Sequence, residues 1–282
     1  MITFKQKLLY IYIKTKFTIL SFLSPRLAAA KAFKLFSTPI FKAKVVLSEQ
    51  FQEAQHLQFT FKGYVIRGYR FNHPQSKKLL IVHGFQSHAS KFDHFIEPFT
   101  NKGYEVLAFD APGHGHSSGK RLNALLYKEM IQHIEQLYGP MDVFLTHSLG
   151  GLASSLALEE CSNSQQKLIL IAPVTETTSA IKMLFQLLPL PIKVQQEFEH
   201  VVRRNGGKPS TWYSVSRILP KLHCHVLWVH DENDFITPFE DAKKVFDKQL
   251  PHIQHVITQK LGHRRVYHDK QVLKKIKEFL EV

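Results

Sequence analysis

The stretch LTHSLGGL (Leu145–Leu152) places one serine between a histidine and two glycines, directly after the apolar run VFL. A serine at the end of a strand is exposed on a sharp turn only if the following helix can approach the strand closely. Gly150 supplies the room for that approach, and the chain continues as GGLASSLAL, which is rich in small residues. The stretch therefore predicts a strand, a tight turn that carries Ser148, and a helix.

Six short runs of β-branched and other apolar residues lie between residues 79 and 261. They span 79–83, 106–110, 143–148, 168–173, 226–230 and 255–261. Nearly continuous apolar character is typical of strands that are buried on both faces, and hence of a parallel sheet. Helical patterns fill the intervals, so the sequence predicts an α/β fold, with a mostly parallel central sheet and helices on both faces.

Helices are expected from the spacing of apolar residues at 92–99, 127–138, 237–246 and 272–280. Gly103 and Gly139 close the first two of these patterns. At the start of the third we expect Thr237 as the N-cap, Pro238 as the first helical residue and Glu240 as the capping-box partner.

A long insertion, residues 174–221, separates two of the predicted strands, and loops of that length are uncommon without a function. Its apolar stretches and two prolines, Pro189 and Pro191, predict two short helices. Because ligands of open α/β sheets bind beyond the carboxyl ends of the strands, we expect a cap that acts as a lid; the alternative is an additional packing layer. The residues expected to contact the apolar part of a substrate are Met183, Leu184, Phe185 and Leu188.

A serine hydroxyl is a weak nucleophile at neutral pH and needs a base, which in turn needs an orienting carboxylate. After a serine in such a turn, the acid and then the histidine follow along the chain. We therefore predict Ser148 as the nucleophile, Asp234 in VLWVHDENDFITP as the acid and His263 in LGHRRVYHD as the base. Asp231 and Glu232 are the alternative acids.

The oxyanion that forms when an ester is attacked needs two hydrogen-bond donors, which are usually backbone N–H groups. We expect one of these from Leu149, the residue after the serine. The other is expected from Phe85 in the HGF stretch that follows the first predicted strand, where Gly84 would let the backbone face inward.

The composition, 44% hydrophobic over 282 residues, is that of a globular protein with one large domain or a domain and a small addition. Cys161 and Cys224 are too few for a disulfide framework and lack zinc-ligand spacing, so a reducing compartment is expected. Much of the net charge of +14 is local, because nine Lys or Arg residues precede the first acid, Glu49. No nucleic-acid-binding motif accompanies this charge, and we expect no nucleic-acid partner.

The basic segment before the first acid is predicted to dock on the protein or to lie at the periphery of a membrane. Lys14 and Lys16 interrupt its apolar stretch, which is therefore much shorter than the roughly 20 residues that a membrane span needs. The same lysines argue against a secretory signal, although LAAAKA imitates a cleavage site. On a helical wheel the lysines between residues 5 and 16 fall on opposite faces, so we expect no single apolar stripe.

Taken together, these motifs resemble the α/β-hydrolase fold serine hydrolases of the esterase, lipase and acylaminoacyl-peptidase-like group. The resemblance covers roughly residues 50–282 and rests on LLIVHGF, FDAPGHGHSSG, THSLGG, HDENDFITP and GHRR. The stretch SPRLAAAKAFKLFSTP is similar to the N-terminal extensions of bacterial members. Three positions depart from the family pattern: Thr146 replaces a small residue, Asp231 a frequent glycine, and His225 a proline.

Seventeen histidines raise the question of a metal site, and HGH (114–116) and HCH (223–225) have alternating spacing. The resemblance places His114 in a turn typical of the family, and His223 and His225 flank a strand. It also implies that His147 packs beside the serine rather than reacts. We therefore expect structural roles for these side chains, no metal and no cofactor.

The triad and the resemblance imply a serine hydrolase that cleaves small carboxylic esters through an acyl-enzyme. A thioesterase or a peptidase would use the same triad, and a binding protein on a hydrolase scaffold is a further alternative, although no triad member is missing. We expect an N-terminal extension at 1–48 and a hydrolase domain at 49–282 that contains the cap insertion. A cytoplasmic protein is expected, peripheral to the inner face of the membrane if the extension binds there; the oligomeric state stays open.

Overall fold

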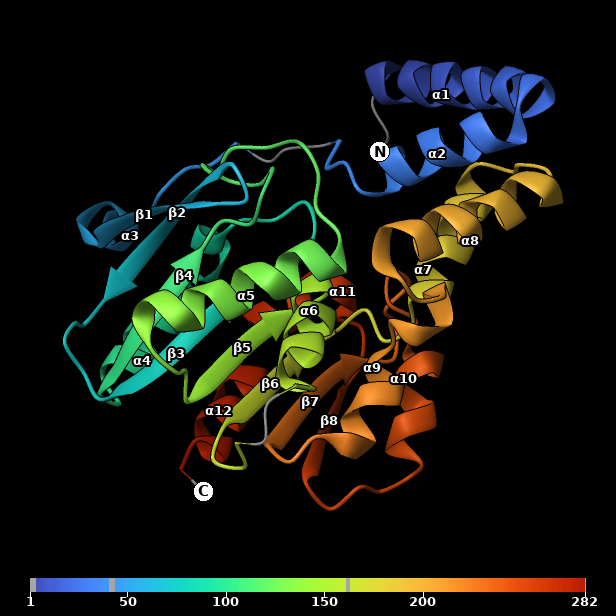
Figure 1. Ribbon diagram of the computed structural model, residues 1–282. Helices are drawn as coiled ribbons and strands as arrows, with labels where there is room; N and C mark the ends of the chain where they lie inside the picture. The colour runs from blue at the N-terminus through green and yellow to red at the C-terminus, as the bar shows by residue number, and fades with distance from the viewer. Residues whose placement is uncertain (1–3, 41–43, 161–162, 282) are drawn as a thin grey trace. The chain divides into compact units, whose positions relative to one another are not determined.

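The computed structural model describes residues 4–40, 44–160 and 163–281 (Figure 1). Cys161 lies outside this description, as does Lys42, one of the nine basic residues that precede Glu49. The chain divides into two compact units. The sheet unit comprises Pro39–Glu176 and Ser214–Val282, and the helical unit comprises Met1–Thr38 and Thr177–Tyr213.

Eight strands form one sheet in the order β1-β2-β4-β3-β5-β6-β7-β8. Their bounds are β1 Gln55–Phe61, β2 Tyr64–Phe71, β3 Lys77–Val82, β4 Tyr104–Phe109, β5 Val143–His147, β6 Lys167–Ile171, β7 His225–Asp231 and β8 Ile253–Thr258. The pairs β1–β2 and β2–β4 are antiparallel, and all other neighbours are parallel. The six predicted strands are β3 to β8, so the mostly parallel sheet is confirmed.

The first two strands, β1 and β2, were not among the predicted ones, yet the sequence carries two signals for them. The stretch HLQFTF alternates apolar and polar residues, as half-buried strands do. Lys62 and Gly63 then connect β1 to β2 with φ of 47° and 78°, the positive values of a two-residue hairpin turn. The antiparallel pair extends the parallel sheet at one edge.

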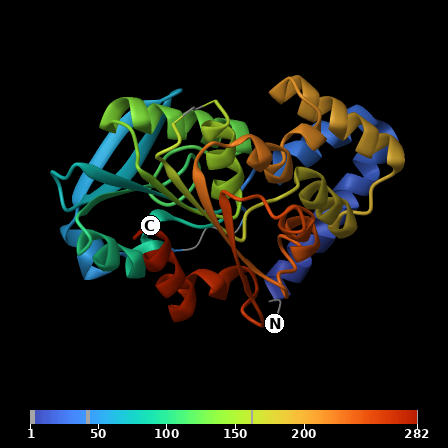
Figure 2. The ribbon, with the colours of Figure 1, turned by 90° about the horizontal axis from the view of Figure 1, so that it is seen from below.

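Helices cover both faces of the sheet (Figure 2). On one face lie α5 (Ala124–Tyr138) and α6 (Leu149–Leu158), which pack against each other. On the other lie α4 (Asp93–Thr100) and α12 (Lys270–Phe279), whose apolar side chains share one buried cluster with the strands. Four short helices complete the sheet unit: α3 Glu49–Glu53, α9 Val215–Ile218, α10 Phe239–Phe246 and α11 Gly262–Arg265.

The capping predicted for the helix at 237–246 is wrong. Helix α10 begins at Phe239, Pro238 is its N-cap residue, and no side chain caps it. The Thr237 hydroxyl instead donates to Asp234 Oδ2 over 2.8 Å. The helix begins one residue later than expected, so Thr237 precedes the cap position, and its hydroxyl binds the carboxylate of the preceding turn.

The helical unit contains α1 (Phe4–Leu23), α2 (Pro25–Phe36), α7 (Thr177–Leu187) and α8 (Ile192–Gly206). Helix α2 packs along α8, and the rings of Phe33, Phe36 and Phe185 lie 5.8, 6.0 and 5.3 Å from that of Phe198. The two helices predicted for the insertion are therefore observed, and they share a core with the first helices of the chain. No helix in the described ranges is long and apolar enough to cross a membrane.

Candidate active site

Ser148 occupies a sharp turn between β5 and α6, as the sequence predicts. Its backbone has φ 54° and ψ −121°, a conformation that is unfavourable for a residue with a side chain. A Cβ atom at Gly150 would lie 2.4 Å from the Val82 carbonyl oxygen and 2.7 Å from that of His83. The backbone atoms of β3 and α6 are too close for any residue but glycine at this position.

Thr146, which departs from the family pattern, is fully buried in β5. Its hydroxyl donates to the carbonyl oxygen of Ile169 on β6 over 2.8 Å. A buried hydroxyl that is hydrogen-bonded avoids the desolvation penalty, and a β-branched side chain suits a strand. The strand therefore accommodates threonine where the family prefers a small residue.

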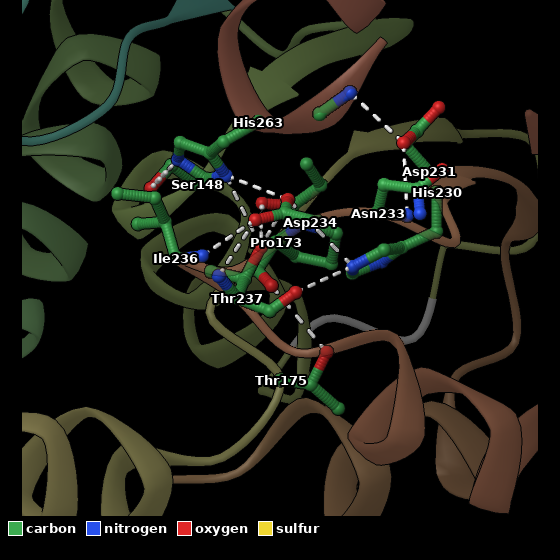
Figure 3. A network of polar contacts seen from close by, with 12 residues as sticks. Ser148, Pro173, Thr175, His230, Asp231, Asn233, Asp234, Ile236, Thr237 and His263 are labelled. Carbon is green, nitrogen blue, oxygen red and sulfur yellow. Dashed lines mark hydrogen bonds and ion pairs between the residues drawn. The ribbon is translucent and has the colours of Figure 1, made fainter. Parts of the chain in front are cut away.

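The structure brings the three predicted triad residues together (Figure 3). Ser148 Oγ lies 3.1 Å from Nε2 of His263, and Nδ1 of His263 lies 2.8 Å from Oδ2 of Asp234. The residues follow β5, β8 and β7, whose carboxyl ends meet at one edge because these strands are parallel. Ser148 and Asp234 are 6% and 3% exposed, so this chain of hydrogen bonds is largely shielded from water.

The Asp234 carboxylate is held in place by its own loop. Oδ1 accepts hydrogen bonds from the backbone N–H groups of Ile236 (2.8 Å) and Thr237 (2.9 Å), and Oδ2 accepts one from the Thr237 hydroxyl. Burial alone would raise the pKa of Asp234, but the hydrogen bond and charge of His263 and the bonds from Thr237 outweigh it and lower the pKa. The carboxylate is therefore ionised when it faces the histidine.

Asp231, the alternative acid, binds groups of residues 258–262. Its carboxylate accepts hydrogen bonds from the backbone N–H groups of Leu261 (3.0 Å) and Gly262 (2.9 Å) and from the Thr258 hydroxyl (2.7 Å). Burial would raise the pKa of Asp231, but these bonds lower it. The side chain thus anchors the loop that immediately precedes His263, which explains why an acid stands where the family often has glycine.

The two backbone N–H groups predicted to hold an oxyanion, those of Phe85 and Leu149, have no acceptor within the described part of the chain. Gly84 lies directly against Ser148, since a Cβ atom at Gly84 would be 2.9 Å from Cβ of Ser148. The absence of a side chain at Gly84 is what lets this loop approach the serine. The Phe85 and Leu149 N–H groups are thus not engaged by another group of the described chain.

Two histidines tie the loop after β3 to the loop after β4, and sequence reasoning missed this function. Nε2 of His83 accepts from the N–H of Ala111 (3.0 Å), and its Nδ1 donates to the carbonyl of Gly84 (2.7 Å). Nε2 of His114 accepts from the N–H of Gln86 (3.0 Å). Burial lowers the pKa of His83 to about 4, so its ring is neutral and can accept. The HG and HGH motifs in the sequence were the available signal.

His147 packs against His263, the predicted base. Its ring centre lies 4.7 Å from that of His263, and its Nε2 donates to the His263 carbonyl over 2.9 Å. Burial lowers the pKa of His147 to about 3, so it brings no positive charge next to His263. Among the residues that the structure describes, no group of three His, Cys, Asp or Glu is arranged to hold a metal ion.

His230 supports the acid loop, and it too was missed. Its ring is fully buried, accepts from the indole N–H of Trp228 (3.2 Å) through Nδ1, and donates to the Thr237 carbonyl (2.8 Å) through Nε2 (Figure 3). Burial lowers its pKa, which favours the neutral ring that this pairing requires. His230 therefore holds the Thr237 carbonyl in place, while the Thr237 hydroxyl donates to Asp234.

The four residues expected to contact substrate lie in the helical unit. Met183, Leu184 and Phe185 are half-buried on α7, and Leu188 just after it is buried. Phe185 packs edge-on against Phe198 of α8, so this side chain stabilises the helical unit itself. Contact of these residues with a substrate stays a prediction.

Residues 73–212 match the family model described as serine aminopeptidase, S33. The chain is 29% identical to the monoglyceride lipase of Rattus norvegicus over 147 residues, which cover 48% of each protein. It is 27% identical to the lysophosphatidylserine lipase ABHD12 of Danio rerio over 196 residues, 64% of this chain and 48% of that protein. These matches span about half the length of the curated relatives.

Among solved structures, the alpha/beta hydrolase domain-containing protein 10 from mouse superposes with a TM-score of 0.62 at 18% identity. The match covers 81% of this chain and 97% of the mouse chain. Similarity at this level of identity concerns the fold. It agrees with the strand order and the helix layers described above.

Proposed function

We propose that this chain, an α/β-hydrolase of the esterase and lipase-like type, hydrolyses carboxylic esters with Ser148 as nucleophile, His263 as base and Asp234 as orienting acid. The observation that carries the proposal is the continuous set of hydrogen bonds from Ser148 Oγ through the His263 ring to the Asp234 carboxylate. Nucleophile, base and orienting acid within hydrogen-bonding reach are the signature of an activated serine.

In the first half of the reaction, Ser148 Oγ attacks the ester carbonyl carbon while its proton passes to Nε2 of His263. The negative charge moves to the carbonyl oxygen, where the N–H groups of Phe85 and Leu149 stabilise it. The C–O bond to the alcohol then breaks, and the alcohol leaves with the proton from His263. An acyl group remains on Ser148.

In the second half, His263 removes a proton from water, and the hydroxide attacks the acyl carbon. The bond to Ser148 Oγ breaks, the serine recovers its proton from His263, and the carboxylic acid is released. Throughout, Asp234 stays ionised and stabilises the imidazolium. The lowered pKa of Asp234 supports this role.

For the substrate we propose an ester with an apolar acyl chain, because the matched relatives are named as lipases of monoglycerides and lysophosphatidylserine. Met183, Leu184, Phe185 and Leu188 are proposed to contact that chain. The insertion that carries them leaves the sheet after the carboxyl end of β6, the edge at which α/β proteins bind ligands. A peptidase is the second candidate, since the matching family model is named for an aminopeptidase.

The test combines active-site labelling with a substrate panel. A fluorophosphonate should label the purified protein at Ser148, as read by peptide mass spectrometry. In a panel of p-nitrophenyl esters, acyl thioesters and peptide amides, esters should react fastest. The rate should climb with acyl length, because each buried methylene contributes up to roughly 0.8 kcal/mol. Faster cleavage of amides would make the protein a peptidase, and labelling at another serine would refute the triad.

The pH dependence of ester hydrolysis should show one ascending limb, because only neutral His263 can accept the serine proton. Asp234, with its lowered pKa, is ionised across the range in which histidines ordinarily titrate, near about 6.5, and His147, with a pKa of about 3, is neutral there. The measurement is kcat/KM for p-nitrophenyl acetate across the acid and neutral range, with EDTA as a control. A steeper, two-proton limb, or activity lost to EDTA and restored by zinc, would contradict this mechanism.

A further inference from the structure

The helical unit holds most of the protein's net charge. Its residues include twelve Lys or Arg and two Glu, so it carries a formal +10 of the total +14. The larger sheet unit carries the remaining +4. An excess of this size on about a quarter of the chain favours an anionic partner for the helical unit.

Helix α1 has apolar residues on two sides, not one. At about 100° per residue, one side carries Phe17, which is buried, and Tyr10, whose hydroxyl donates to the Leu187 carbonyl over 3.1 Å. The opposite side is an exposed stripe that spans an arc of about 120°. We call it the outer stripe; it consists of Leu8, Ile11, Tyr12, Ile19, Phe22 and Leu23, all between 51% and 90% exposed.

Exposed lysines border the outer stripe on both sides. Lys7 and Lys14 lie along one border of the wheel and Lys16 lies along the other, where its ammonium group is 5.7 Å from the Tyr12 ring. The lysines of α1 thus fall on opposite faces, as the helical wheel predicts. In the structure these lysines lie between the apolar side that packs within the helical unit and the exposed outer stripe.

We propose that the outer stripe of α1 docks the protein on the surface of an anionic phospholipid bilayer, with the helix lying in the plane of the interface. In that orientation the apolar side chains enter the acyl boundary, and the lysines extend to the lipid phosphates. Three further exposed apolar residues of the helical unit, Leu27, Leu187 and Ile192, add to the apolar surface of the unit.

The charges oppose pairing of the outer stripe with a second copy of the chain. Pairing two α1 helices through this stripe would bring their lysine borders together. The first 48 residues contain no acid that could neutralise them. A bilayer rich in phosphate groups lacks this conflict, because its charge is opposite to that of the borders.

The test is flotation of the full-length protein with vesicles of phosphatidylcholine alone or with about 30 mol% phosphatidylglycerol. We expect at least about tenfold more binding to the anionic vesicles, and weaker binding at high salt. The double variant Ile11→Ser/Phe22→Ser, which changes no charge, should lower this binding about tenfold or more. Leu137→Ser, at an exposed leucine on α5 of the sheet unit, is the matched control and should bind like wild type.

The triple variant Lys7→Gln/Lys14→Gln/Lys16→Gln should lower binding to the anionic vesicles several-fold and so weaken the preference for them. None of these changes touches the proposed triad, so hydrolysis of a soluble acetyl ester should be the same for all variants. The proposal is wrong if wild type does not float, or if the double variant floats equally well. It is also wrong if that variant turns a dimer into a monomer without affecting flotation. Because flotation needs no catalysis, a failure of the proposed function would be seen separately.

Discussion

Replacing Ser148 by alanine should lower kcat for a short p-nitrophenyl ester by about 10⁴-fold or more, because nucleophile and base act as one unit. The variant keeps Gly84, Gly150 and the backbone of the turn, so the oxyanion donors stay in place. The remaining rate should be that of catalysis by binding and oxyanion stabilisation alone. His263→Ala should cause a loss of similar size, and the double variant should be little worse than either single one.

The matched control for this experiment is Ser154→Ala on the same helix, α6. Ser154 is fully buried, and its hydroxyl has no hydrogen-bond partner in the described chain. Its removal should leave both folding and turnover near those of wild type. Unchanged hydrolysis by purified Ser148→Ala protein would refute the assignment of the nucleophile.

Asp234→Asn should lower kcat by about 10³ to 10⁴-fold while the fold is kept. Asparagine is nearly isosteric and can still accept from the N–H groups of Ile236 and Thr237. It cannot stabilise the imidazolium by charge, and its amide group favours the wrong tautomer of His263. The measurement is kcat and KM for the same ester, with the melting temperature as a check of folding; the loss should fall in kcat.

Asp231→Asn is the comparison that separates the two acids. The contacts of Asp231 predict a loss of stability and a mild effect on kcat. Oδ2 of Asp231 accepts from both the Leu261 N–H and the Thr258 hydroxyl, so an amide group there would face donors. Stability should fall by about 1–3 kcal/mol, while the folded variant keeps most of its kcat. A larger loss of kcat in Asp231→Asn than in Asp234→Asn would make Asp231 the triad acid.

Much of the fold and of the candidate site follows from local patterns in the sequence. Continuous apolar runs predicted the parallel strands, because a strand covered on both faces has no polar side. Small residues after the serine predict that strand and helix approach each other closely behind Ser148, and Gly150 is the residue that indicated this. The order of Ser148, Asp234 and His263 was visible because each residue ends or follows a predicted strand, and parallel strands end at one edge of the sheet.

The contacts of Thr237 and of Asp231 did not follow from these local patterns. Thr237 precedes a helix and satisfies the rule for an N-cap, yet its hydroxyl donates to Asp234, whose carboxylate is brought there by the same turn. Asp231 is the last residue of β7, and Asp234 follows three residues later. The tertiary structure distinguishes them by their contacts. Asp231 binds the backbone N–H groups of Leu261 and Gly262 and so anchors a loop, whereas Asp234 contacts the His263 ring.

Helix α1 shows the same division between sequence and tertiary structure. The sequence alone determined that its lysines lie on opposite faces and that apolar residues fill the spaces between them. The two apolar sides of α1 are similar, so the local sequence does not predict which of them is buried. Burial depends on which side contacts other helices in the folded chain. Only the tertiary structure, through packing within the helical unit, decided that Phe17 is buried and Phe22 is left exposed.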